Sequence, residues 1–396
     1  MWQRIILHCD LNNFFASVTL LENQTLTDMP VAICGSKADR HGIVLAKNEH
    51  AKKYGVKTAE AIWQAKQKCP DLIILPPNYE KYEYYSLEAR KIYAKYTDKI
   101  EPFGIDECWL DVTGSTMLFG SGEEIAHKIR QDIKKDLGIT VSVGVSFNKV
   151  FAKLGSDMKK PDAVTVISPD DFKEKIYSMP ISDLLFAGHK TAEKLNSVGV
   201  FTIGDITLVS DATLTRLLGK NGLELKRYAL GQDSSPVADM NAKTVPKSIS
   251  KSITGAKDFT NEDEVWQTIL ALSEEITGKL REEHLYAGGV QVHIRDANLV
   301  TREPCKALKN PTDIAILIAE AALKVFRENY FWETPLRSIG VRAIHLKKDV
   351  SAEQTDMFSN SEIAAKKEKI ENSIYNIRKK FGKNSVKRAR TIKNKQ

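Results

Sequence analysis

Residues 104–113, GIDECWLDVT, place two adjacent carboxylates directly before an apolar run. The acids are Asp106 and Glu107, and the apolar run begins at Cys108. Burying an ionised carboxylate costs several kcal/mol unless it is paired or bound to a metal, so acids beside a buried strand need a partner. Side chains alternate along a strand, so two neighbouring acids can share one site only where the alternation breaks. The turn residues at 102–104 predict such a break at a hairpin tip, although two solvated charges at the start of a strand remain the alternative.

A second strand ends on a carboxylate near the N-terminus. Residues 4–9, RIILHC, predict a short buried strand that ends on Asp10, with Ile6 and His8 on the same face as Asp10. Mg²⁺ prefers oxygen ligands, usually a few carboxylates, waters and substrate phosphates. Two such ions can hold the attacking and leaving oxygens of an in-line phosphoryl displacement. The two strand ends therefore predict metal-dependent nucleotidyl transfer.

Three motifs in chain order resemble one known family. Residues 9–18, CDLNNFFASV, and the stretch GIDECWLDVT are similar to the two metal-binding motifs of the Y-family DNA polymerases, the translesion group, and closest to the bacterial DNA polymerase IV branch. Residues 141–161, VSVGVSFNKVFAKLGSDMKKP, resemble that family's strand, Asn-Lys turn and basic helix. The resemblance continues in order to about Leu346. Any one motif would be a weak signal, but three in order are specific.

The resemblance implies an α+β, multidomain, right-hand polymerase. It would have a palm of mixed or antiparallel sheet plus helices, small fingers, a helical thumb with a helix-hairpin-helix-like segment, and a βαββαβ little finger. The expected boundaries are 1–13 and 79–167 for the palm, 14–78 for the fingers, 168–234 for the thumb, 235–244 for a linker, 245–350 for the little finger, and 351–396 for a clamp-binding peptide and basic tail. Within the second palm segment, Ser121 and Glu124 predict a helix with a capping box, and Gly138 predicts its end.

The resemblance also implies a two-metal site. Asp10, Asp106 and Glu107 would be the catalytic residues and would hold two Mg²⁺. The backbone carbonyl of Leu11 would join the ion on the nucleotide side. Asn12 stands where many relatives have an acid, and it is not expected to hold metal.

The nucleotide site combines matches with departures from the family pattern. Phe14 and Phe15 are nucleotide-binding candidates, and Phe15 falls where the family packs an aromatic ring against the incoming sugar to exclude a 2′-hydroxyl; a buried aromatic pair is the alternative. Lys160 matches the lysine that approaches the triphosphate, and lysine suits phosphate as a point charge. Lys52 stands at an arginine position, so it keeps the charge but loses the bidentate fork, and Glu49 stands at a tyrosine position.

Other candidates would bind DNA. The thumb segment LLFAGHKTAEKLNSVGV resembles a helix-hairpin-helix in which Gly188 remains and Phe186 replaces the first turn glycine. Lys149 and Lys153 are weaker candidates for DNA or nucleotide. Basic side chains of the little finger could position the DNA backbone without reading its sequence, or could be ordinary surface charges: Lys247, Lys251, Arg295, Arg302, Arg337 and Arg342.

A short peptide near the C-terminus resembles the segment by which bacterial polymerases dock on the sliding β-clamp. It is QTDMF, with Gln354, Asp356, Met357 and Phe358 as the candidate contacts. Two apolar anchors beside a glutamine on a polar segment fit a pocket with directional hydrogen bonds. The alternative is a hydrophobic staple for a tail helix predicted over residues 362–381.

The composition is that of a globular protein, with 396 residues of which 42% are hydrophobic and 28% charged. The five cysteines show no CxxC spacing, and no window resembles a membrane span or signal peptide, so we expect a cytoplasmic protein with reduced thiols. The net charge of +7 comes wholly from residues 361–396, where twelve basic and three acidic side chains give +9 and leave −2 for the first 360 residues. The first 360 residues should therefore bind DNA only through local basic patches, and the tail of residues 361–396 should be attracted to nucleic acid.

The sequence thus predicts an error-tolerant, template-directed DNA polymerase without a proofreading exonuclease. It would add dNTPs to a primer 3′-OH on primer-template DNA, as a monomer that docks on the clamp. Two alternatives stay open at this point. One is another palm-type enzyme, such as a nucleotide cyclase, and the other is a catalytically silent, clamp-bound scaffold. The presence of all three acids argues against silence.

Overall fold

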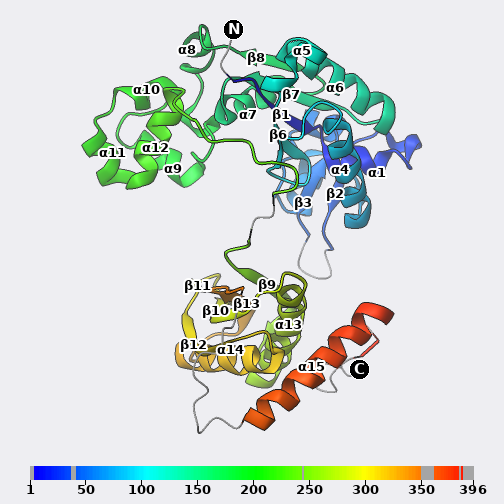
Figure 1. Ribbon diagram of the computed structural model, residues 1–396, viewed down its shortest axis with the longest axis vertical. Coiled ribbons are helices and arrows are strands. Elements are labelled where there is room, and N and C mark those ends of the chain that lie inside the picture. The colour runs from blue at the N-terminus through cyan, green and yellow to red at the C-terminus, as the bar shows by residue number, and fades with distance from the viewer. Residues whose placement is uncertain (1–3, 37–41, 243–244, 349–360, 383–384, 387–396) are drawn as a thin grey trace. The chain divides into compact units, whose positions relative to one another are not determined.

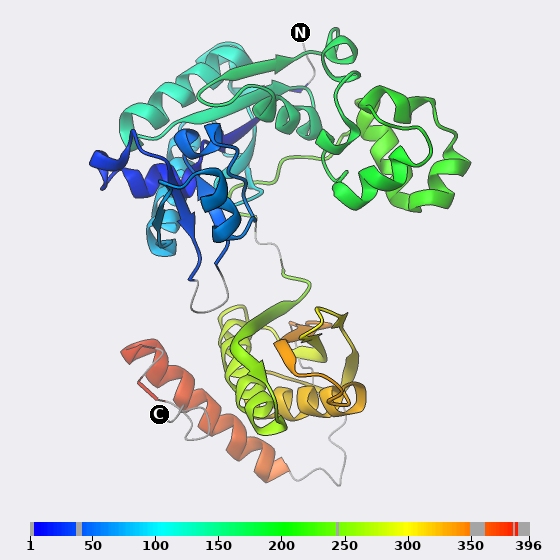
Figure 2. The same ribbon diagram turned by 180° about the vertical axis from the view of Figure 1, so that it is seen from behind.

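The computed structural model describes residues 4–36, 42–242, 245–348, 361–382 and 385–386 (Figures 1 and 2). These residues form two compact units, the first reaching residue 242 and the second beginning at residue 245. Within the described ranges, no helix is long and apolar enough to cross a membrane.

A five-stranded sheet forms the centre of the first unit, in the order β5-β6-β1-β7-β8. Its strands are β1 (Ile6–Leu11), β5 (Ile100–Pro102), β6 (Glu107–Asp111), β7 (Val141–Ser146) and β8 (Val164–Ile167). β1 pairs antiparallel with both β6 and β7, β5 and β6 form the predicted hairpin, and β7 pairs parallel with β8. The two strands predicted to carry the acids are therefore neighbours in one sheet.

Alternation along β1 decides which face each of its residues serves. Leu7, Cys9 and Leu11 lie in the main core, together with residues of α4 (Tyr79–Tyr93) and α6 (Gly122–Leu137). The other face of β1 packs against a different helix.

That helix is α7 (Lys149–Met158), and it approaches the sheet closely. A Cβ added at Gly144 of β7 would lie 1.9 Å from the Ala152 carbonyl oxygen of α7, and a Cβ added at Gly155 would lie 3.2 Å from the Gly144 Cα. Only glycine at position 144 permits this approach. As a result, polar side chains of α7 reach His8 of β1 and Glu107 of β6.

Local signals account for the ends of α6. The Ser121 hydroxyl accepts the Glu124 N–H, and the Glu124 carboxylate accepts the Ser121 N–H. The helix ends at Gly138, which adopts the left-handed conformation that glycine tolerates. The predicted capping box and helix end are both confirmed.

The segment between β1 and α4 carries a small three-stranded sheet in the order β3-β2-β4. Its elements are α1 (Phe14–Leu20), a 3₁₀ turn (Gln24–Leu26), β2 (Val31–Cys34), β3 (Val44–Lys47), α2 (Glu49–Lys53), α3 (Ile62–Lys68) and β4 (Ile73–Leu75). The fingers are predicted in this part of the chain. Their boundaries, like those of the other domains, stay a prediction.

After β8 the first unit continues as short helices. They are α8 (Phe172–Ile176), a 3₁₀ turn (Ile181–Asp183), α9 (His189–Asn196), α10 (Ile203–Leu208), α11 (Asp211–Leu218) and α12 (Lys220–Ala229). Two short elements also follow β6 earlier in the chain, a 3₁₀ turn (Thr113–Ser115) and α5 (Thr116–Phe119). Leu195, Ile206 and Leu225 of these helices share a core with Phe151 of α7. The helical segment is therefore joined to the sheet through α7.

The second unit packs two helices on one face of a sheet. Its elements are β9 (Ile249–Phe259), α13 (Glu262–Glu282), β10 (Ala287–Asp296), β11 (Thr301–Arg302), β12 (Cys305–Thr312), α14 (Ala315–Asn329) and β13 (Leu336–Ile344). The sheet order is β11-β10-β13-β9, and β12 also pairs with β10. The predicted βαββαβ order is confirmed, with its third strand divided into β11 and β12 along one edge of β10.

A further helix, α15 (Ser361–Phe381), lies against α13. Arg281 of α13 donates to the Glu371 carbonyl (3.0 Å), and Arg378 pairs with Glu274 of α13 (2.9 Å). The predicted tail helix is therefore present and packs on the second unit.

Candidate active site

Asp10 of β1 lies directly opposite Glu107 of β6 in the sheet register. The next residue, Leu11, donates its N–H to the Asp106 carbonyl (3.1 Å), so Leu11 and Asp106 occupy a hydrogen-bonded position and Asp10 and Glu107 the closer, non-hydrogen-bonded one. Side chains at such a position share one face, with Cβ atoms about 4.5–5.5 Å apart. Two like charges there destabilise the sheet unless a cation lies between them.

Asp106 lies in the turn, outside the regular strand, where alternation no longer separates it from Glu107. The hairpin is closed by Phe103 N–H, which donates to the Glu107 carbonyl (3.0 Å). Burial and the nearby Glu107 charge raise the pKa of Asp106. Burial also raises the pKa of Asp10 to about 7, although Lys160 acts to lower it. The carboxylates are thus close enough to affect one another's ionisation.

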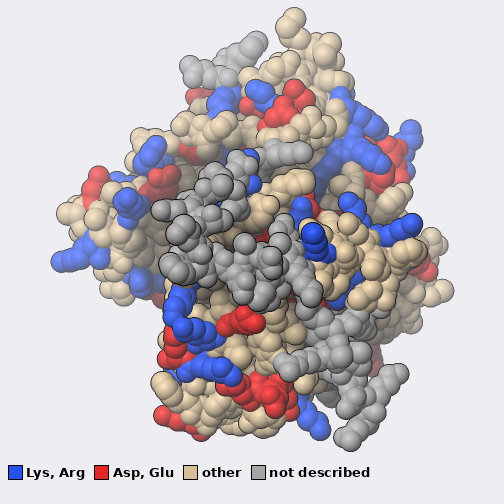
Figure 3. Space-filling model, turned by 60° about the horizontal axis from the view of Figure 1, so that its bottom comes forward, with Lys and Arg blue, Asp and Glu red and all other residues tan. Residues whose placement is uncertain are grey.

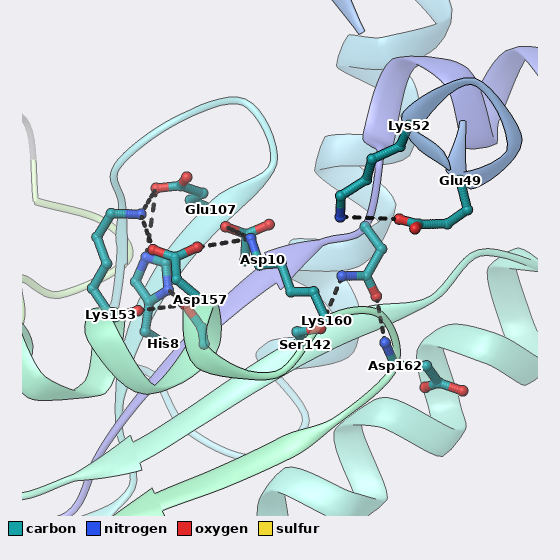
Figure 4. Close-up of polar contacts among 12 residues, drawn as sticks. His8, Asp10, Glu49, Lys52, Glu107, Ser142, Lys153, Asp157, Lys160 and Asp162 are labelled. Atoms are coloured by element: carbon teal, nitrogen blue, oxygen red, sulfur yellow. Dashed lines mark hydrogen bonds and ion pairs between the residues drawn. The ribbon is translucent and has the colours of Figure 1, made fainter. Parts of the chain in front are cut away.

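Two lysines hold the acids (Figure 4). Lys160 Nζ lies 2.7 Å from Asp10 Oδ2, and Lys153 Nζ lies 2.8 Å from Glu107 Oε2. Asp157 contacts both lysines, at 2.9 Å from Lys160 and 3.8 Å from Lys153. Among the described residues, no three or more His, Cys, Asp and Glu side chains are already arranged to hold a metal ion. Each ammonium group therefore occupies one oxygen of its carboxylate partner.

Three charged side chains from residues 153–160 gather beside the acids. The sequence predicts Lys160 there and Lys153 as a weaker candidate, but gives no prediction for Asp157. A signal was available for Asp157, because it lies four residues after Lys153 and so shares one face of α7 with it, whereas Lys160 lies beyond the end of that helix.

His8 is fully buried beneath the acids, on the same face of β1 as Asp10. Its Nδ1 lies 2.8 Å from Ser156 Oγ, and its Nε2 lies 3.6 Å from Glu107 Oε2. Burial alone would raise the pKa of Glu107. His8 and Lys153 have a larger, opposite effect, so the pKa of Glu107 lies well below its ordinary value. Glu107 is therefore ionised at neutral pH.

The nucleotide-binding candidates differ in accessibility. The Phe15 ring stacks on Tyr82, with ring centroids 4.1 Å apart, and is partly exposed. Phe14 is only 2% exposed and packs in the core, where it has no free face for a nucleotide. Lys52 Nζ lies 3.5 Å from Glu49 Oε1, so this acid offsets part of the charge that Lys52 has to offer a triphosphate.

The thumb turn keeps its backbone shape without the glycine. Gly188 is the N-cap of α9. Phe186 has a φ of 69°, in the left-handed region, and its side chain is 62% exposed. The backbone is therefore in the conformation that glycine favours, although the residue is phenylalanine.

The DNA candidates of the second unit lie in different places. Arg295 of β10 and Arg342 of β13 share the sheet face opposite α13 and α14, because the alternate residues of both strands are buried under these helices. Lys251 lies opposite the buried Val341, faces the helices and pairs with Glu275 of α13 (3.5 Å). Lys247 is exposed before β9. Figure 3 shows Lys and Arg interspersed with Asp and Glu on the face in view.

The clamp-binding candidates Gln354, Asp356, Met357 and Phe358 lie outside the described residues. The same holds for the basic residues from 387 onward.

Comparison with known proteins gives consistent matches. The model of the impB/mucB/samB family matches residues 9–157, and that of the family's C-terminal domain matches residues 246–357. DNA polymerase IV of Acetivibrio thermocellus is 49% identical over 386 residues, which cover 98% of this chain and 97% of that protein. DNA polymerase IV 1 of Bacillus subtilis is 34% identical, with 98% and 94% covered.

A solved structure supports the same assignment. The Y-family DNA polymerase chimera Dbh-Dpo4(243-245)-Dbh superposes with a TM-score of 0.77 at 26% identity, covering 87% of this chain and all of the chimera. The chain therefore belongs to the Y-family DNA polymerases, within the branch of the bacterial DNA polymerase IV proteins. The family predicted from the three sequence motifs is confirmed.

Proposed function

We propose that Asp10, Asp106 and Glu107 hold two Mg²⁺ and that this site performs nucleotidyl transfer in the chain. Membership in the family makes the chain a DNA-directed DNA polymerase of the translesion type. The observation that carries the site assignment is the directly opposed Asp10–Glu107 pair, with Asp106 beside it in the turn. Three carboxylates, with the Leu11 carbonyl at the strand end, are the hard oxygen donors that Mg²⁺ prefers.

The metal ions, when bound, would lower the energy of the attacking 3′-oxygen and of the leaving pyrophosphate. The chain's own acids orient these oxygens by fixing where the cations sit. Lys160 pairs with Asp10 and would be available to a substrate phosphate if Asp10 held a cation instead. Lys153 would keep Asp157 as a partner if Glu107 held a cation.

Phe15 is proposed to contact the sugar of the incoming dNTP. Its ring is held by stacking on Tyr82, so it cannot turn aside easily to admit a 2′-hydroxyl. Lys52 is the second proposed phosphate ligand, weakened by its contact with Glu49.

Primer-template DNA is proposed to contact the helical segment at Gly188 and the second unit at Arg295, Arg342 and Lys247. Lys251 contributes less, since it is directed toward Glu275. Contacts of this kind position the phosphate backbone and carry no sequence preference. We further propose that the chain acts as a cytoplasmic monomer and docks on the sliding clamp through Gln354, Asp356, Met357 and Phe358.

Primer extension by the full chain tests the site. Wild type should extend a primer on intact and abasic templates only with a divalent cation, and Asp106→Ala should be slower by more than about a hundredfold. Asp170→Ala, which replaces an exposed carboxylate elsewhere, serves as the control. Extension by Asp106→Ala at the wild-type rate would show that the acids are idle and would favour the scaffold alternative.

A further inference from the structure

The side chain of Asn12 is buried directly after the end of β1. It is 4% exposed, and both polar atoms of its amide group have hydrogen-bond partners. Its Nδ2 donates to Ser142 Oγ of β7 (2.8 Å). Its Oδ1 accepts the Thr140 hydroxyl (3.0 Å) and the backbone N–H of Asp162 (2.9 Å). The amide therefore joins three chain segments that are distant in sequence.

Asp162 is held from its other side by α6. Its carboxylate pairs with Arg130 Nε (3.1 Å) and Lys134 Nζ (3.1 Å). Asp162 also has a φ of 53°, a left-handed conformation that a non-glycine residue keeps only when its surroundings enforce it. Its backbone bond to Asn12 and its two ion pairs supply that enforcement.

Lys160 lies two residues before Asp162 and reaches Asp10 (Figure 4). Its Nζ contacts Asp10 Oδ2 (2.7 Å) and Asp157 Oδ1 (2.9 Å). Lys160 and Asp10 belong to segments about 150 residues apart, and the Asn12–Asp162 bond joins the same two segments. Asn12 is two residues from Asp10, so the bond sets the distance between the strand that carries the acid and the loop that carries the lysine.

We propose that Asn12 is a positioning residue for Lys160, holding the lysine loop in register with the Asp10 strand so that the ammonium group meets the substrate triphosphate. An amide suits this task better than an acid. It accepts the Asp162 N–H and the Thr140 hydroxyl without adding a negative charge that would compete with Asp10 for Lys160. This inference rests on the proposed function of Asp10 and Lys160.

A double-mutant cycle on the full chain tests the inference. Lys160→Ala should raise KM for dNTP by roughly ten- to a hundredfold, the loss of one charge-assisted bond. Asn12→Ala should raise it by about three- to tenfold. In the Lys160→Ala background, Asn12→Ala should add no further increase, because its effect passes through the lysine. Dissociation constants for dNTP, measured on the primer-template complex with Ca²⁺ in place of Mg²⁺, should change in parallel with KM.

Two further variants separate positioning from loss of stability. Arg130→Gln loosens Asp162 from the partly exposed side and leaves the buried amide intact, so it should raise KM in the same direction by a smaller factor. Asn261→Ala removes the N-cap of α13 in the second unit and should lower the melting temperature with KM unchanged.

An unchanged KM in both Asn12→Ala and Arg130→Gln would overturn the inference, as would effects of Asn12→Ala and Lys160→Ala that multiply. Failure of the proposed function has a different signature. In that case Asp106→Ala would retain extension, whatever the Asn12 variants do.

Discussion

Asp10 and Glu107 face each other at the closest position of an antiparallel strand pair, yet their ionisation has opposite effects on the fold. Burial raises the pKa of Asp10, whereas His8 and Lys153 outweigh burial at Glu107 and lower its pKa. The metal-free protein therefore holds one carboxylate that resists ionisation beside one that is ionised.

A pH dependence follows for the metal-free protein. The folded pKa of Asp10, about 7, lies above the unfolded value, so the stability linked to its protonated form is present below roughly pH 4 and is lost as the pH rises through about 7. In EDTA, the free energy of unfolding of wild type should fall between pH 5 and 8 by on the order of 1–3 kcal/mol more than that of Asp10→Asn. Urea unfolding at the two pH values measures this, with Asp170→Asn as the control. Parallel pH profiles for wild type and Asp10→Asn would contradict the assignment.

A second prediction for a single residue concerns how Phe15 discriminates between deoxyribonucleotides and ribonucleotides. Phe15→Ala should raise ribonucleotide incorporation relative to deoxyribonucleotide incorporation by roughly tenfold or more, because removal of the ring frees space for a 2′-hydroxyl. The measurement is the ratio of kcat/KM for rNTP and dNTP on one template. Phe14→Leu, a change in the buried neighbour, is the control and should leave the ratio unaltered. An unchanged ratio in Phe15→Ala would remove Phe15 from the sugar contact.

At the scale of elements, glycine and its substitutes decide how closely segments approach. Gly144 lets α7 approach β7 closely, and α7 then delivers Lys153 and Asp157 to the acids. In the turn before α9, a residue other than glycine occupies a position that favours glycine, since Phe186 has a left-handed backbone conformation. A non-glycine residue pays about 1–2 kcal/mol for this conformation.

The turn at Phe186 predicts that a glycine variant is more stable than the alanine variant, the opposite of the usual order. Glycine substitutions are ordinarily less stable than alanine ones, but Phe186→Gly should be more stable than Phe186→Ala by about 1 kcal/mol, because only glycine relieves the left-handed conformation. Urea unfolding of the two variants gives the difference. Both variants lose the ring contact with Tyr228, so that contact cancels. If Phe186→Ala proved the more stable variant, the turn would not be left-handed at this position.

For the whole molecule, charge is divided between body and tail. The first 360 residues carry a net charge of −2, and residues 361–396 carry +9. Because phosphate contacts dominate affinity for DNA, we expect the positively charged tail to contribute to DNA binding.

Truncation after residue 382 tests this division and keeps α15 in place. It removes six basic residues and no acids: Lys383, Lys387, Arg388, Arg390, Lys393 and Lys395. Binding to primer-template DNA should weaken, and the slope of log K against log salt should become less steep by up to about 5. Fluorescence anisotropy at several salt concentrations measures both. An unaltered slope would mean that the tail does not contact DNA.

Deletion of residues 354–358 tests the proposed clamp contact. Extension on a bare primer should be retained, and stimulation by a bacterial sliding clamp should be lost, because the two apolar anchors are removed. Replacement of the same five residues by a Gly/Ser segment controls for chain length. An equal loss of activity with and without the clamp would point to misfolding.

The sequence by itself determined the elements and much of the chemistry they carry. Strand parity around Asp10, the turn before Asp106, the capping box at Ser121 and the residues within each of the three family motifs all depend on positions close together in the sequence. The tertiary structure alone decided that Asp10 faces Glu107, that Asn12 bonds a residue 150 positions away and that Lys251 turns toward the helices. Strand register and the close approach at Gly144 set these contacts, and both result from packing between distant segments.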